Sequence, residues 1–190
     1  MTLRERFRHQ TLNLAAFAWG VAEGTLFFIV PDVLLSFIGL RRGAQPAFIA
    51  CLAAAIGAAL GGVVMYAWSA QDPAGVYDLV LHVPAISGDM GEAARTAMAE
   101  QGWFAATLEG PLSRTPYKVY AVLAPQAGAP LWLFAAASIL ARLPRFLIVS
   151  MACALIARYG APRFGMATLT RALALGWVLF YVGFFALTPG

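Results

Sequence analysis

The stretch from Gly43 to Gln71 contains no charged residue and is long enough to cross a lipid bilayer as one helix. A spanning helix needs about 20 mostly apolar residues. Two later stretches come close to this requirement. Leu131 to Ala157 is long enough but contains Arg142 and Arg145, and Ala172 to Thr188 is uncharged but short. The sequence therefore predicts three spanning helices, at about 46–70, 131–157 and 171–188.

The composition also indicates an integral membrane protein. Of the 190 residues, 61% are hydrophobic and 12% are charged, whereas a soluble domain carries about 45–50% apolar and about 25% charged residues. The formal net charge of +4 does not indicate nucleic-acid binding, because the basic residues are scattered among apolar runs instead of forming a patch. Cys51 and Cys153 lie inside apolar runs and are interpreted as small buried residues.

Two other apolar stretches, 12–40 and 103–128, contain prolines or charges near the middle and make poor straight spans. We interpret them as re-entrant hairpins, whose irregular backbone must be shielded by protein or water. The two stretches share an order of landmarks, which predicts an inverted repeat with a binding site near the middle of the membrane. The landmarks are Trp19, Glu23-Gly24, Pro31 and Pro46 in the first, and Trp103, Glu109-Gly110, Pro116 and Pro130 in the second.

The predicted fold is thus an all-α integral membrane protein with two inverted re-entrant helical hairpins, about three transmembrane helices and one surface amphipathic helix. A single membrane domain, 1–190, would contain four parts. These are a first hairpin and span at 11–70, an extramembrane segment at 72–102 with a helix near 89–102, a second hairpin and span at 103–157, and a last helix at 171–188.

The distribution of charge predicts an orientation. The N-terminus, the Arg41-Arg42 pair and the connection 158–171 are basic, whereas 72–109 is acidic. Because basic connections tend to stay in the cytoplasm, we expect these basic pieces on the cytoplasmic side and the acidic segment outside.

Six charged residues lie within or next to the apolar segments. A charge at the bilayer centre costs about 2.5–3.5 kcal/mol on insertion scales, so such residues are expected to face a protein interior or a wet cavity. We expect Glu23 and Asp32 to be protonatable acids. The basic members of the set are Arg114, Lys118, Arg142 and Arg145.

The prolines indicate where short helices begin inside the hairpins. Thr115 has the character of an N-cap and Pro116 that of a first helical residue, which predicts a helix at 116–124. Its N-terminus, with Arg114 and Lys118 beside it, would bind a phosphate or carboxylate. Pro31 is expected to start the matching helix, with Asp32 in its first turn.

Arg142 and Arg145 are three residues apart and therefore share a helix face, and Pro144 between them is expected to kink that helix. A structural role is the alternative for these charges. An ion pair between Asp32 and Lys118, or between Glu23 and an arginine, would hold the two hairpins together, and such a pair is compatible with a binding role.

These residues resemble the DedA family, also called the VTT or SNARE-associated Golgi protein family. The likeness lies in Glu23 through Pro31-Asp32, in the run from Arg114 to Lys118, and in Pro125-Gln-Ala-Gly128, and it covers roughly residues 15–157. The Pro-Tyr-Lys form is similar to the short bacterial YqaA-like branch. Lys118 replaces the second arginine of the family pattern at a shifted spacing, and the Pro125 motif lacks one residue.

The resemblance implies facing re-entrant hairpins, and membrane-embedded acids and arginines needed for activity. It also implies a lipid scramblase or flippase, often linked to proton motive force, in the bacterial inner (plasma) membrane. The expected partners are membrane lipids, with a phosphate-bearing head group held by Arg114, Lys118, Arg142 and Arg145. The sequence leaves open whether the chain forms a homo-oligomer.

Other functions stay open to different degrees. A proton-coupled transporter of a small anion or drug would use the same charges. We do not expect an enzyme, because neither His9 nor His82 lies in a recognisable motif and the spacing of Ser113 and Lys118 indicates no nucleophile. No metal-ligand pattern or phosphate-binding glycine loop is present, and we expect no metal or cofactor. A purely structural protein is the remaining alternative.

Overall fold

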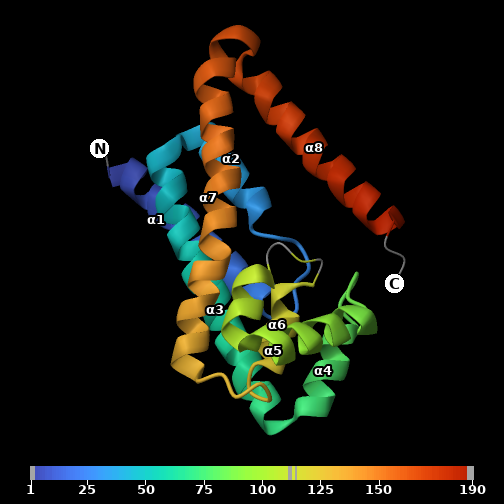
Figure 1. Ribbon diagram of the computed structural model, residues 1–190. Helices are drawn as coiled ribbons and strands as arrows, with labels where there is room; N and C mark the ends of the chain where they lie inside the picture. The colour runs from blue at the N-terminus through green and yellow to red at the C-terminus, as the bar shows by residue number, and fades with distance from the viewer. Residues whose placement is uncertain (1–2, 111–112, 114, 188–190) are drawn as a thin grey trace.

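The structure is a computed structural model that describes residues 3–110, 113 and 115–187, with side chains from Gln10 onward. Within these ranges the secondary structure consists of eight helices joined by turns and irregular connections, with no strand (Figure 1). In chain order the helices are α1 (Leu3–Gly24), α2 (Asp32–Arg42), α3 (Ala44–Gln71), α4 (Pro73–Leu81), α5 (Gly88–Glu109), α6 (Tyr117–Leu123), α7 (Leu131–Phe164) and α8 (Met166–Leu187).

Three helices, α3, α7 and α8, are long and apolar enough to cross a membrane, as the sequence predicts. The second is longer than expected, because α7 continues through Pro144 and ends only at Phe164. The predicted connection 158–171 is therefore wrong. Gly165 alone joins α7 to α8, with a φ of +78° that favours glycine.

Neither of the two interrupted stretches forms one continuous helix. In the first, α1 ends at Gly24 and α2 begins at Asp32, with Pro31 as its N-cap. A helix start at Pro31 with Asp32 in the first turn is what the sequence predicts. In the second, α5 ends at Glu109 and α6 begins at Tyr117. The order of a helix, a connection, a short helix and then a long helix therefore occurs twice.

Glycines bring α1 against α3. A Cβ atom on Gly57 would overlap the carbonyl oxygen of Phe17, and one on Gly20 would overlap that of Ala54. Gly57 and Gly61 are four residues apart, the spacing that lets membrane helices approach closely. Gly20 faces Ala54 and Gly24 faces Ala58, so these contacts advance together along both helices and α1 and α3 run in the same direction.

Each short helix packs beside the long helix of the other half of the chain. Asp32 and Gly39 of α2 face Arg145 and Ser150 of α7 in the same order, so α2 and α7 run in the same direction. Tyr117 and Val122 of α6 likewise face Gly62 and Ser69 of α3. The two halves therefore interlock through their short helices.

The acidic segment and the basic turns lie at opposite ends of the molecule. Helices α4 and α5 lie at the bottom of Figure 1, and the corner between α7 and α8 lies at the top. Arg41 at the end of α2 donates a hydrogen bond of 3.2 Å from Nη1 to Oγ1 of Thr170 in α8, which brings the Arg41-Arg42 pair to that corner.

The predicted extramembrane segment, 72–102, contains more helix than the sequence predicts. The helix expected near 89–102 is present as part of α5, but α5 continues past Gly102, where the backbone leaves the helical conformation with φ +83°. Helix α4 was not predicted. Asp72 caps it by accepting a hydrogen bond of 3.0 Å from the Gly75 amide, and Pro73 follows the cap. This Asp-Pro pair is a helix start that sequence reasoning could have recognised.

Candidate functional site

Both acids of the first half form ion pairs with arginines of α7. Glu23, in the last turn of α1, pairs with Arg142, and both side chains are buried. Asp32, in the first turn of α2, is 1% exposed, and its Oδ2 lies 3.1 Å from Nη2 of Arg145. The sequence left open whether Asp32 would pair with Lys118, and it pairs with Arg145 instead.

Aromatic rings hold Arg142 in place. Its guanidinium carbon lies 5.1 Å from the ring centre of Tyr117 and 5.2 Å from that of Phe146, within the range of cation–π attraction. The Tyr117 hydroxyl donates a hydrogen bond of 2.6 Å to Oγ of Ser138, which fixes the ring. One carboxylate and two aromatic rings therefore surround this buried guanidinium.

Lys118 has no carboxylate partner in the described part of the chain. The side chain is 2% exposed, and its Nζ donates a hydrogen bond of 2.7 Å to the carbonyl oxygen of Phe27, in the connection between α1 and α2. That acceptor carries no formal charge. Among the described residues, three buried or half-buried cations therefore face two acids.

The start of α6 differs from the prediction. Pro116 has an extended backbone and is itself the N-cap, so the helix spans Tyr117–Leu123 and not 116–124. Thr115 does not cap it, because its Oγ1 donates a hydrogen bond of 3.3 Å to the carbonyl oxygen of Met90 in α5. Arg114, the other residue expected at this end, lies outside the described residues.

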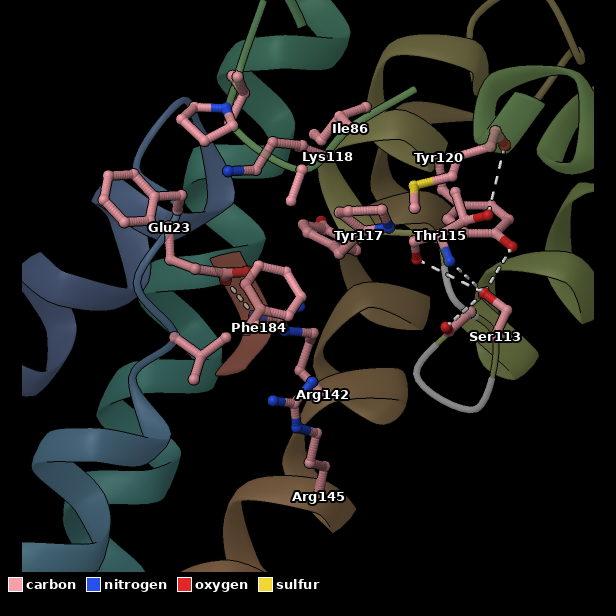
Figure 2. Close-up of a pocket in the computed structure, with 18 of the residues that line it drawn as sticks. Glu23, Ile86, Ser113, Thr115, Tyr117, Lys118, Tyr120, Arg142, Arg145 and Phe184 are labelled. Carbon is pink, nitrogen blue, oxygen red and sulfur yellow. Dashed lines mark hydrogen bonds and ion pairs between the residues drawn. The ribbon is translucent and has the colours of Figure 1, made fainter. Parts of the chain in front are cut away.

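A cavity of about 530 Å³ joins these groups (Figure 2). It lies between the α1–α2, α4–α5 and α5–α6 connections and helices α5, α6, α7 and α8. Its charged lining consists of Glu23, Lys118, Arg142 and Arg145. Asp32 does not line it and is connected to it through Arg145. The aromatic lining consists of Phe28, Tyr117, Tyr120, Phe180, Tyr181 and Phe184.

Sequence reasoning missed the contribution of α8. No residue of this helix is buried, yet Phe180, Tyr181 and Phe184 line the cavity. Tyr181 accepts a hydrogen bond of 3.0 Å from the Val30 amide at its hydroxyl, and Trp177 donates one of 2.9 Å to Oγ of Ser36. These aromatic residues recur at intervals of three and four, which predicts one helix face and could have revealed this wall.

The site thus combines positive charge with an aromatic surface. Its volume lies within the range of about 300–1,000 Å³ that is usual for ligand pockets. Lys118 and the two arginines can donate hydrogen bonds to anionic oxygens, and the aromatic residues can contact an apolar chain.

No protein-family model, curated protein or solved structure matches this chain.

Proposed function

We propose that this chain is a membrane transporter of the DedA type, a scramblase or flippase of a phosphate-bearing lipid such as a phospholipid or a polyprenyl phosphate. The membrane would be the bacterial plasma membrane. The observation that carries the proposal is Lys118, a buried ammonium whose partner in the described chain is only the carbonyl oxygen of Phe27. An anionic phosphate would be a stronger acceptor for the same hydrogen bond.

The lining of the cavity favours a lipid over a small hydrophilic anion. Lys118, Arg142 and Arg145 supply positive charge to the lining. Phe28, Phe180 and Phe184 supply an apolar wall. In the proposal the phosphate binds Lys118, with Arg142 and Arg145 assisting, and the hydrocarbon chain lies along α8.

The repeated helix order supports the part of the proposal that concerns the membrane. If 12–40 and 103–128 are two re-entrant hairpins that enter from opposite faces, their connections meet at the depth of the cavity. The hydrogen bond from Lys118, in the first turn of α6, to Phe27 ties the start of this short helix to the α1–α2 connection. Irregular backbone at that depth would be shielded by α3, α7 and α8, as a bilayer requires.

The two acids provide a means of proton coupling in this proposal. Glu23 neutralises Arg142, and Asp32 neutralises Arg145. Protonation of either carboxyl would weaken its ion pair and make the arginine available to a phosphate. Departure of the phosphate would favour the deprotonated acid again. Lipid movement would then respond to the proton gradient.

Proteoliposomes containing a fluorescent phosphate lipid test the proposal. Lys118→Met removes the charge with little change in volume, and we expect the rate of lipid translocation to fall about tenfold or more, the effect of losing one charge-assisted hydrogen bond. Lys118→Arg should retain more activity. Arg171→Ala, which removes an exposed charge at the far corner, is the matched control and should translocate at the normal rate.

Two results would contradict the proposal. Equal translocation by the parent protein, Lys118→Met and Arg171→Ala would exclude Lys118 from the pathway. Flux of a soluble anion without any lipid movement would instead favour a proton-coupled transporter of small anions.

A further inference from the structure

A second pocket of about 360 Å³ lies between α1 and α2. Both helices pack against α3, as the buried cluster around Ala16, Leu35 and Ala50 records, but their side chains leave a groove between them. The groove is separate from the central cavity, with which it shares no lining residue. It is lined by Leu12, Leu34, Phe37, Ile38, Arg41 and Arg42.

The groove follows one face of α2. Its α2 residues occur at positions 34, 37, 38, 41 and 42, the three- and four-residue spacing of a single helix face. From Leu34 to Arg42 this face is about 12 Å long at the rise of an α-helix. Its walls are apolar for most of this length, and both arginines lie at one end.

The two arginines can bind an anion. Among the side chains described, from Gln10 onward, neither has a carboxylate within ion-pair distance. Arg41 uses one donor for Thr170, and a guanidinium has five. The planar fork of an arginine matches the geometry of a phosphate.

The position of the groove identifies the kind of ligand. Arg41 and Arg42 lie at the end of the molecule that carries the basic corner between α7 and α8. An apolar groove that ends in paired cations matches the two parts of a phospholipid, and basic pockets between membrane helices are typical sites for anionic head groups. A zwitterionic head group would bring its own cation close to the arginines, so an anionic lipid fits better.

We propose that this groove binds one anionic phospholipid, with an acyl chain along the face of α2 and the phosphate between Arg41 and Arg42. The lipid fills the space between the arms of the first helix pair and keeps them at a fixed separation. This site does not depend on transport, and it can exist whether or not the central cavity moves a lipid.

Native mass spectrometry of the detergent-solubilised protein with added phosphatidylglycerol or phosphatidylcholine tests the site. We expect a phosphatidylglycerol adduct that survives mild activation and a weaker phosphatidylcholine adduct. In Arg41→Ala/Arg42→Ala the apparent affinity for phosphatidylglycerol should fall about 30-fold, the effect of losing two basic residues near an anionic lipid. Arg163→Ala/Arg171→Ala removes the same charge from the neighbouring corner, outside the groove, and should keep the adduct.

A second variant tests the groove itself. Leu34→Trp would fill the groove without changing its charge and, in a Lys118→Met background that lacks the phosphate ligand proposed for the central cavity, should also remove the adduct. If Leu34→Trp keeps it, or if both double-arginine variants lose it equally, the lipid is held by general surface charge and the proposed site is wrong. Equal retention of the two lipids by the parent protein would also contradict it. Lys118→Met should keep this adduct, so failure of the central transport site is distinguishable from failure of this one.

Discussion

At the scale of single residues, Glu23 and Arg142 form an ion pair whose two side chains are both buried. An arginine does not lose its proton in a protein, so a buried guanidinium needs an anion close to it. Glu23 supplies that charge, and Tyr117 and Phe146 supply the surrounding rings. The same pair lines the central cavity, so it contributes both to stability and to the charge of the site.

We therefore expect Glu23→Gln to destabilise the protein by about 3–5 kcal/mol, the cost of breaking a buried ion pair on one side. Thermal unfolding in detergent micelles measures the change. Glu109→Gln, at an exposed acid in the corresponding place of the second half, is the matched control and should have little effect. The double substitution Glu23→Gln/Arg142→Gln should recover much of the lost stability, because neither position then holds an unpaired buried charge. If Glu23→Gln and Glu109→Gln unfold at the same temperature, the pair does not support the fold.

At the scale of helices, glycine determines how closely α1 approaches α3. We expect Gly57→Ala to destabilise the protein by about 1–3 kcal/mol, the usual cost of overpacking, because the new methyl group would overlap the Phe17 backbone. Gly176→Ala is the control in α8, where nothing lies within 4 Å of the added atom, and the better helix propensity of alanine makes this change neutral or slightly stabilising. The unfolding temperature of Gly57→Ala should therefore fall, and that of Gly176→Ala should stay the same or rise. If both variants unfold at the same temperature, α1 and α3 are not in close contact at Gly57.

The helices differ in how well the sequence predicts them. The spans α3, α7 and α8 follow from local composition, and the breaks before Asp32 and Tyr117 follow from prolines. The end of α7 does not follow from the sequence pattern, because the helix continues through Pro162 and ends only at Phe164, before Gly165. For the site, four of the charges expected inside are buried, Arg145 is half-buried, and Arg114 lies outside the described residues. Their partners do not follow from the sequence. Whether Asp32 meets Lys118 or Arg145 depends on the direction and register of helices that are distant in the sequence.

At the scale of the whole molecule, charge is divided between two ends. The Arg41-Arg42 pair and the α7–α8 corner lie at one end, and the acidic helices α4 and α5 lie at the other (Figure 1). Because α3 and α7 connect the two ends and each is long enough to cross a bilayer, a membrane around them would separate the basic groups from the acidic ones. For a chain that spans a membrane in this way, the positive-inside tendency predicts that the basic end faces the cytoplasm.

This orientation predicts which positions are reachable from outside the cell. Glu100 in α5 and Arg163 in α7 are both exposed, and Cys51 and Cys153 are buried, so replacing the two cysteines by alanine gives an unreactive parent. In that background we expect a membrane-impermeant maleimide to label Glu100→Cys in intact cells. Arg163→Cys should react only after the membrane is permeabilised. The parent without added cysteines controls for background labelling. Reversed labelling would invert the orientation, and labelling of both positions from outside would mean that α7 does not separate them across a membrane.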